Sequence, residues 1–269
     1  MTIRGGIDMP ILGQGTWRMG EIAAERTREV AALQLGIDLG MSLIDTAEMY
    51  GDAESVVGEA IRGRREQVFL VSKVLPKNAS RRGTRAACER SLGKLGVDSI
   101  DLYLLHWQGA HPLEDTLATF AELVAEGKIG AFGVSNFDVA DLTRAQKMPG
   151  GAAIAANQVL YNLTRRGPEA KLLAQCRTAS IALMAYTPIE RGSVAGPALS
   201  AVAERHRVSP AQVAIAWTLR HDGVVSIPKA SDPEHVRQNA AAFDLVLDEN
   251  DLRELDAAFP RRTSAIETL

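Results

Sequence analysis

The chain has 269 residues, of which 46% are hydrophobic and 23% are charged, and its 30 basic and 33 acidic residues leave a net charge of −3. This globular balance, with acids and bases mixed along the chain, excludes a disordered polymer and indicates no nucleic-acid partner. The opening residues MTIRGGIDMP lack the apolar core of a secretion signal, and no run of about 18 apolar residues follows, so we expect no membrane partner. Cys88 and Cys176 lie far apart in helix-like stretches, which favours a reduced, cytoplasmic protein over one with a disulfide.

The predicted elements begin with a hairpin, because Gly5-Gly6 separates two short β-prone pieces in the first twelve residues. The first helix carries apolar residues at helical spacing and stops at Gly40. Pro197 and Pro210 each stand in the first turn of a later helix. Helical patterns occur, in chain order, over 21–39, 54–62, 83–95, 114–126, 138–146, 168–179, 197–206, 210–220, 233–242 and 249–258.

Between these helices lie eight short apolar runs, each of which ends on a polar residue. Successive ends are 23 to 43 residues apart, which is about one strand and one helix. The runs are continuous rather than alternating, as is typical of parallel strands buried on both faces. The ends are marked by Gly15, Asp45, Lys73, His106, Ser135, Gln158, Tyr186 and Lys229.

This repetition predicts an α/β fold, namely a (β/α)₈ TIM barrel formed by residues 1–269 as one domain. We expect the N-terminal hairpin to plug the N-terminal mouth of the barrel. The helices in the long gap before the last strand, and those that follow it, supply extra helices near the C-terminal end. Because the chemistry of a barrel sits at the C-terminal ends of its strands, the polar ends are the candidate site.

Asp45, Lys73 and His106 each end a strand, and Tyr50 follows Asp45 by five residues. A free tyrosine has a pKa near 10, which is too high for a good proton donor at pH 7. An ammonium beside the phenol is expected to lower that pKa, and a carboxylate behind the ammonium holds it charged. A histidine alongside can donate a hydrogen bond to a carbonyl oxygen. The set therefore predicts a proton donor for a carbonyl that is being reduced.

These side chains cannot supply the reducing equivalents, so the set implies a hydride-carrying cofactor. Ser135, Asn136 and Gln158 offer amide and hydroxyl groups for a carboxamide, Tyr186 offers a flat ring, and Lys229 offers a charge for phosphate. A Rossmann fingerprint is absent, because GQGTWR lacks the last glycine of G-x-G-x-x-G.

Each of these residues, taken alone, has a structural alternative. Asp45 could cap a helix, and His106 could be a satisfied core histidine. Their joint occurrence at successive strand ends favours catalysis.

We predict no metal site, because His111, His206 and His221 have no partner at metal-ligand spacing.

These residues stand in segments that resemble the aldo/keto reductase family over essentially the whole chain. The segments are GQGTW (13–17), LIDTAEMYG (43–51), LVSKV (70–74), DLYLLHW (101–107), GVSNF (133–137), NQVLYN (157–162), AYTP (185–188) and IPKAS (227–231). Among the members of that family, the chain is most similar to short-looped bacterial ones, some of which reduce methylglyoxal.

The resemblance implies an NADPH-dependent, monomeric reductase of small aldehydes and ketones that uses hydride transfer. Tyr50 would be the general acid, tuned by Lys73 and Asp45, while His106 would orient the carbonyl. The substrate pocket would be lined by Trp17, Tyr50, His106 and Trp107. The cofactor would lie against Gly15, Thr16, Trp17, Asp45, Ser135, Asn136, Gln158, Tyr186, Thr187, Pro188, Ile189, Ile227, Pro228, Lys229, Ala230, Ser231, His235, Gln238 and Asn239.

The chain departs from the family pattern at the expected 2′-phosphate site. The family has Lys-Ser followed by an arginine, whereas this chain has Lys229-Ala230-Ser231 and then His235. A histidine lacks the bidentate fork of arginine, so NADH stays open as an alternative cofactor.

The alternative function is a cofactor-binding, redox-sensing regulatory subunit with little turnover. The complete set of Asp45, Tyr50, Lys73 and His106 argues against it.

Overall fold

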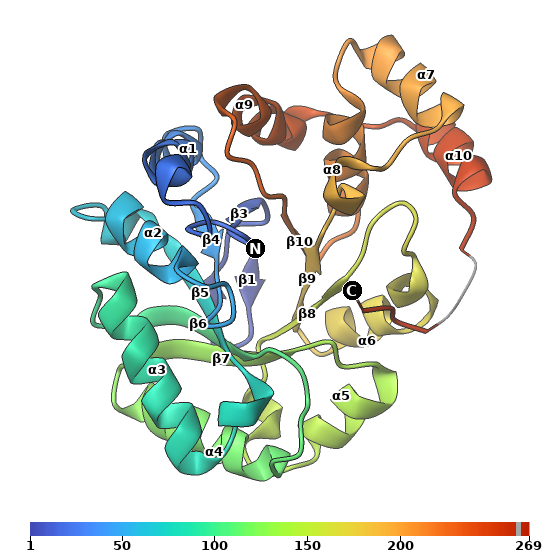
Figure 1. Cartoon of the computed structure of the whole chain (residues 1–269). Coiled ribbons are helices and arrows are strands. Elements are labelled where there is room, and N and C mark those ends of the chain that lie inside the picture. Colours follow the sequence, from blue (N-terminus) through green and yellow to red (C-terminus); the bar gives the residue numbers. More distant parts are fainter. Residues whose placement is uncertain (262–264, 269) are drawn as a thin grey trace.

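Eight parallel strands, each preceding a helix, form the centre of the computed structural model, which describes residues 1–261 and 265–268 (Figure 1). Neighbouring strands follow one another in chain order from β3 to β10. The strands are β3 (Gly13–Gly15), β4 (Leu43–Asp45), β5 (Phe69–Val74), β6 (Ile100–Leu105), β7 (Ile129–Ser135), β8 (Ala156–Leu160), β9 (Ala182–Tyr186) and β10 (Val224–Ile227).

The first and last strands meet and close the barrel. Leu12 and Ser226 form a parallel bridge, and the Gly15 amide donates to the Pro228 carbonyl at 3.0 Å. A Cβ atom on Gly15 would come within 2.9 Å of the Ile227 carbonyl oxygen, so the closure needs glycine there. The predicted (β/α)₈ barrel is therefore confirmed.

The helices surround the barrel on its outside (Figure 1), and their apolar faces and the outer faces of the strands form one large core. The α-helices are α1 (Arg26–Asp38), α2 (Ala53–Ala60), α3 (Arg81–Leu95), α4 (Leu113–Ala125), α5 (Val139–Gln146), α6 (Leu172–Thr178), α7 (Pro197–His206), α8 (Pro210–Leu219), α9 (Pro233–Ala241) and α10 (Glu249–Ala258). Short 3₁₀ helices are η1 (Ala23–Glu25), η2 (Arg65–Gln67), η3 (Pro76–Asn78), η4 (Gly151–Ala153), η5 (Gly167–Ala170), η6 (Glu190–Gly192) and η7 (Ala242–Asp244). The extra helices expected near the C-terminal end are α7 and α10.

Several predicted helix boundaries were wrong. The helix predicted over 21–39 begins only at Arg26, after the separate 3₁₀ helix η1, and the one predicted over 54–62 ends at Ala60. The helix predicted over 83–95 begins two residues earlier, because Ser80 caps it by accepting a hydrogen bond from the Gly83 amide at 3.1 Å. The single helix predicted over 168–179 is divided into η5 and α6, since Lys171 between them has φ −152°, which is not helical.

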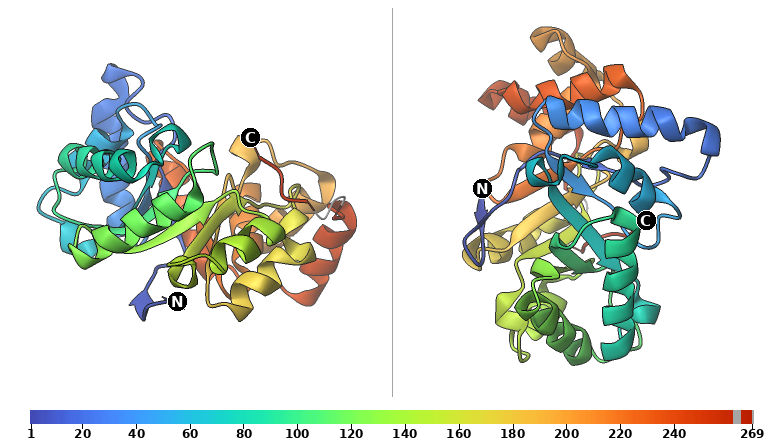
Figure 2. Two further views of the ribbon diagram at one scale, coloured as in Figure 1. Left: turned by 90° about the horizontal axis from the view of Figure 1, so that it is seen from below. Right: turned by 90° about the vertical axis from the view of Figure 1, so that its left-hand side faces the viewer.

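The N-terminal hairpin consists of β1 (Thr2–Ile3) and β2 (Ile7–Asp8), which pair antiparallel. Ile3 and Met9 are buried in the apolar cluster inside the barrel, against residues near the N-terminal ends of strands, such as Leu43 and Phe69. The hairpin therefore plugs the N-terminal mouth, as predicted. Figure 2 shows the N-terminus and the C-terminus at opposite ends of the barrel.

Two further features bear on the sequence predictions. Cys88 and Cys176 are buried free thiols, and burial raises the pKa of each to about 12. Within residues 1–261 and 265–268, no helix has the length and apolar character that crossing a membrane requires.

Candidate active site

The register of the sheet brings three of the predicted catalytic residues to one end of the barrel. Asp45 is the last residue of β4, Lys73 is the fifth residue of β5, and His106 directly follows β6. Because the strands are parallel neighbours, their C-terminal ends meet at the same mouth. The loop after β4 returns Tyr50 to this group.

Lys73 is fully buried and contacts both Asp45 and Tyr50. Its Nζ donates to Asp45 Oδ2 at 2.7 Å, to the Thr46 carbonyl at 2.8 Å and to Tyr50 Oη at 3.4 Å. Burial disfavours the charge on Lys73, but Asp45 and Tyr50 outweigh burial and raise its pKa above the ordinary value. Lys73 is therefore a charged ammonium at neutral pH.

The Tyr50 phenol behaves differently from the sequence-based expectation. Burial raises its pKa, and this effect exceeds the opposing effect of the Lys73 ammonium. The expected lowering of the pKa is thus wrong for the protein without ligands, because the sequence does not reveal how far the phenol is removed from water. The phenol is protonated at pH 7, which is the state that a proton donor needs.

His106 lies beside the phenol. Its ring centroid is 5.7 Å from that of Tyr50, at an interplanar angle of 76°, and 4.9 Å from that of Trp107. Burial and the nearby Lys73 lower the pKa of His106 to about 3, so the ring is neutral. A neutral imidazole carries one N–H donor and one acceptor, which is sufficient to orient a carbonyl oxygen.

A second polar group lies at the ends of β7, β8 and β9. Ser135 Oγ donates to the Gln158 carbonyl at 2.8 Å, and Asn136 Nδ2 donates to the His106 carbonyl at 3.1 Å. Tyr186 Oη donates to Asn136 Oδ1 at 3.0 Å. Asn136 has φ 61°, a left-handed conformation that asparagine tolerates better than most residues.

The second group is joined to the first by the hydrogen bond from Asn136 to the His106 carbonyl and by another in which Gln158 Nε2 donates to Asp45 Oδ1 at 2.7 Å. Asp45 therefore accepts from Lys73 with one carboxylate oxygen and from Gln158 with the other. The arrangement is a continuous polar layer across the C-terminal mouth, with a charged pair in its centre.

The ends of β3 and β10 form the third part of the mouth. Thr16 is buried and donates to the Asp45 carbonyl at 2.9 Å, whereas Trp17 is 40% exposed. Lys229, just beyond β10, is exposed, and its Nζ donates to Ser231 Oγ at 2.6 Å. Partial removal of its ammonium from water is the largest effect on Lys229 and lowers its pKa.

The remaining predicted cofactor contacts fall into three stretches. Thr187, Pro188 and Ile189 form the loop after β9, in which Thr187 has φ 55°. His235, Gln238 and Asn239 lie in α9; Asp232 caps this helix and Asn239 is buried in it. The last contacts, Ile227, Pro228 and Ala230, flank the barrel closure between Gly15 and Lys229.

Sequence reasoning missed two residues near the mouth. The Arg191 guanidinium lies 4.5 Å from the Trp17 ring centroid, although it comes from the loop after β9. Glu48, in the loop that carries Tyr50, accepts hydrogen bonds from the next strand's loop. Their sequence neighbourhoods give no periodic signal, so only the folding of the loops reveals them.

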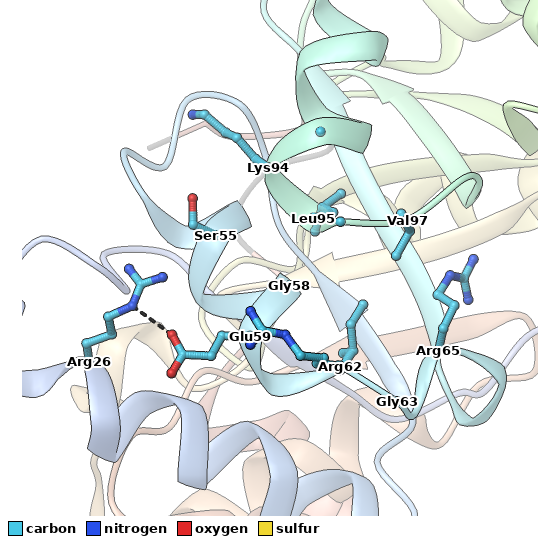
Figure 3. A pocket seen from close by; sticks show the side chains of 13 residues that line it. Arg26, Ser55, Gly58, Glu59, Arg62, Gly63, Arg65, Lys94, Leu95 and Val97 are labelled. Atoms are coloured by element: carbon cyan, nitrogen blue, oxygen red, sulfur yellow. Dashed lines mark hydrogen bonds and ion pairs between the residues drawn. The ribbon is translucent and has the colours of Figure 1, made fainter.

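A separate hollow of about 370 Å³ lies on the outside of the barrel, between α2 and α3 (Figure 3). Arg26, Arg62, Arg65 and Lys94 border it, but Arg26 is paired with Glu59 and Arg65 with Asp101. Both helices end there, and helix C-termini carry partial negative charge. None of the predicted catalytic residues lines this hollow, so the strand ends remain the candidate site.

Known proteins resemble this chain in sequence and in structure. A sequence model of the aldo/keto reductase family matches residues 11–259. The methylglyoxal reductase YeaE of Escherichia coli is 48% identical over 264 residues, which cover 95% of this chain and 93% of that protein. The glyoxal reductase of Bacillus subtilis is 36% identical over 260 residues, covering 95% of this chain and 91% of that protein.

Among solved structures, an aldo/keto reductase from Klebsiella pneumoniae in complex with NADP and acetate has a TM-score of 0.95 at 45% identity. The match covers 99% of this chain and 98% of that chain. A second Klebsiella pneumoniae aldo-keto reductase structure, in complex with NADPH, gives the same score, identity and coverage.

Proposed function

The chain belongs to the aldo/keto reductase family, and on this premise we propose that it reduces small aldehydes and ketoaldehydes, including methylglyoxal, to alcohols with NADPH. The observation that carries the proposal is the group of Asp45, Lys73 and His106 at successive strand ends with Tyr50 from the loop after β4, in which Lys73 contacts Asp45 at 2.7 Å and Tyr50 at 3.4 Å. The names of the similar proteins support both the substrate class and the cofactor.

Tyr50 is the general acid in this proposal. It holds its proton at pH 7, because burial raises its pKa, and it gives the proton to the substrate oxygen as negative charge develops there. Lys73 stabilises the phenolate that remains, since its ammonium lies 3.4 Å from the phenol oxygen. Asp45 keeps Lys73 charged and fixed in place. His106, which is neutral, orients the carbonyl oxygen with a hydrogen bond.

The layer of polar groups at β7, β8 and β9 fits a nicotinamide cofactor. Ser135, Asn136 and Gln158 offer donors and acceptors for its carboxamide, and Tyr186 offers a ring for stacking. When bound, NADPH supplies the hydride that reduces the carbonyl carbon. Lys229 and Ser231, which are hydrogen-bonded to each other, are the groups that would meet its 2′-phosphate.

The exposed aromatic residues at the mouth are assigned to the substrate. Trp17 is 40% exposed and Trp107 is 38% exposed, although large apolar side chains are mostly buried elsewhere in the described chain. Trp107 contacts His106, so it lies next to the carbonyl site. These rings would cover a compact substrate from two sides and exclude water from it.

The test is turnover by the purified protein, followed as the loss of NADPH absorbance with methylglyoxal. Replacing Tyr50 with phenylalanine should lower kcat by several orders of magnitude, because the proton donor is lost, while NADPH binding should stay near the wild-type value. General acid catalysis alone contributes about 10²–10⁴-fold. A phenylalanine variant that retains more than about a tenth of the activity would remove Tyr50 from this role. Wild-type protein that binds NADPH without turnover on a panel of aldehydes would instead support the regulatory alternative.

A further inference from the structure

Tyr50 stands in a loop, and within residues 1–261 and 265–268 its phenol has one hydrogen-bond partner, Lys73 at 3.4 Å. The loop runs from the end of β4 to the start of α2 and contains no helix or strand. Its backbone is held to β5 at two points: the Thr46 amide donates to the Val71 carbonyl at 2.9 Å, and the Glu48 amide donates to the Lys73 carbonyl at 3.2 Å. Tyr50 itself is held by its backbone, because its amide donates to the Ala47 carbonyl at 3.0 Å and its carbonyl accepts from the Ala53 amide at 3.0 Å.

The side chain of Glu48 adds hydrogen bonds between this loop and the residues that follow β5. Its carboxylate accepts from the Leu75 amide at 2.6 Å, from Asn78 Nδ2 at 3.0 and 3.1 Å, and from Arg90 Nη2 at 3.2 Å. The side chain is 10% exposed. A carboxylate with several donors at these distances is fixed in one orientation, because charge-assisted hydrogen bonds are short and strong.

The hydrogen bond between the Glu48 carboxylate and the Leu75 amide lies close in sequence to both Tyr50 and Lys73. Glu48 is two residues before Tyr50, and Leu75 is two residues after Lys73. The hydrogen bond between Glu48 and Leu75 therefore links the strand that carries the ammonium to the loop that carries the acid. None of the contacts of the Glu48 carboxylate in the described chain involves Asp45 or His106.

We propose that Glu48 is a positioning residue, which fixes the separation between the Tyr50 phenol and the Lys73 ammonium and so sets the rate of proton donation. This inference rests on the proposed function, in which Tyr50 is the general acid. It acts through the loop, since Glu48 touches neither the phenol nor the ammonium. Without Glu48 the Leu75 amide would lose its acceptor.

Two substitutions test the proposal. Glu48→Ala removes all the acceptors, and we expect kcat to fall about 10²-fold, because a displacement of about 1 Å at a reacting group has that effect. Glu48→Gln keeps one oxygen for the Leu75 amide but turns an NH₂ group toward Asn78 and Arg90, so we expect a smaller fall of about tenfold. The dissociation constant for NADPH, measured by fluorescence titration, should change less than twofold in both variants.

A double-mutant cycle with Lys73→Met distinguishes a positioning effect of Glu48 from a general loss of structure. If Glu48 acts by holding the phenol against Lys73, its substitution should have little further effect on kcat once the ammonium is gone. An equal fold-loss in the wild-type and Lys73→Met backgrounds would overturn the proposal, as would a Glu48→Ala kcat within twofold of wild type. Should circular dichroism show that Glu48→Ala does not fold, Glu48→Gln carries the same cycle.

The matched control is Glu59→Ala. Glu59 is an exposed glutamate on α2 that pairs with Arg26 at 2.9 Å on the outside of the barrel. We expect its kcat to stay within twofold of wild type. Wild-type turnover of methylglyoxal is measured in parallel, so that a failure of the proposed function is seen apart from a failure of this inference.

Discussion

At the scale of single residues, the site is built around one buried charge. Lys73 is fully buried, and its charge is balanced by Asp45 at 2.7 Å. Removing one partner of a buried ion pair costs about 3–5 kcal/mol, because the other charge is left without compensation. Asp45 also accepts from Gln158, so the residue that holds the ammonium also orders the amide next to it. Stability and chemistry are therefore coupled at Asp45.

The ionisation states of Tyr50 and His106 predict how the rate depends on pH. The proposed mechanism requires a protonated phenol, and burial raises the pKa of Tyr50 above its ordinary value, so the rate should fall only when the pH rises through that raised pKa. His106 has a pKa of about 3, so its neutral form persists, and it should cause no loss between pH 5 and pH 8. The measurement is kcat for reduction against pH in saturating NADPH. An alkaline loss centred below pH 9 would contradict the assignment of the acid to Tyr50.

His235 leads to a second prediction at the residue scale. It stands in the first turn of α9 where the family pattern has an arginine, and a histidine lacks the bidentate fork with which arginine binds phosphate. We expect a preference for NADPH over NADH that is weaker than about 10³-fold in kcat/KM, which corresponds to about 4 kcal/mol. The ratio of kcat/KM for the two cofactors measures it. His235→Arg should raise the ratio, because it restores the bidentate contact, whereas a wild-type preference above that limit would contradict weak discrimination.

At the scale of elements, helix α1 is fastened to the barrel by close packing against β3. The amide nitrogen of Gln14, a buried residue of β3, donates to the Leu33 carbonyl at 3.1 Å and to the Met41 carbonyl at 3.0 Å. Gly36 faces this amide, and a Cβ atom on Gly36 would lie 2.0 Å from Gln14 Oε1. The first helix can approach the first strand of the barrel because this position lacks a side chain.

Two glycines in the last turns of their helices test that packing. Gly36→Ala should destabilise the fold by about 1–3 kcal/mol, since the new methyl group displaces the Gln14 amide from its partners. Gly93→Ala, in α3, should stabilise it by about 0.5–1 kcal/mol, because a Cβ atom there meets nothing within 4 Å. Urea unfolding of both variants gives the two free energies. Equal effects of the two substitutions would show that packing at Gly36 does not limit the approach of α1.

The strand ends could be predicted from the sequence, whereas loop contacts could not. A buried parallel strand is a continuous apolar run, so its polar end is visible, and Asp45, Lys73 and His106 do lie together. The role that we infer for Glu48 depends on the path of two loops, which no periodic pattern encodes. The pKa of Tyr50 depends on how completely the fold removes water, and that effect proved larger than the neighbouring charge. The non-helical backbone of Lys171, which divides η5 from α6, also could not be predicted, because the helical pattern of apolar residues continues across it.

At the scale of the whole molecule, the two ends of the barrel carry different tasks. The C-terminal ends of the strands hold the ion pair, the phenol and the exposed tryptophans. The N-terminal mouth is filled by the hairpin, whose Ile3 and Met9 are buried in the cluster inside the barrel. Changes at the plugged mouth should therefore affect stability, and changes at the open mouth should affect catalysis.

Met9 provides the test of this division. Its side chain is 1% exposed, and Met9→Ala should cost about 2–5 kcal/mol, because it leaves a cavity under the hairpin. For a chain of this size each kcal/mol lowers Tm by roughly 2–4 °C. Met49→Ala is the matched control, since Met49 is 45% exposed next to Tyr50 and should change the stability by less than about 0.5 kcal/mol. Well below its Tm, Met9→Ala should keep kcat within about twofold of wild type, because the plug lies at the mouth opposite to the phenol. A tenfold loss of kcat in the folded Met9→Ala protein would mean that the plug positions the catalytic end through the barrel, and the division of tasks between the two mouths would then be wrong.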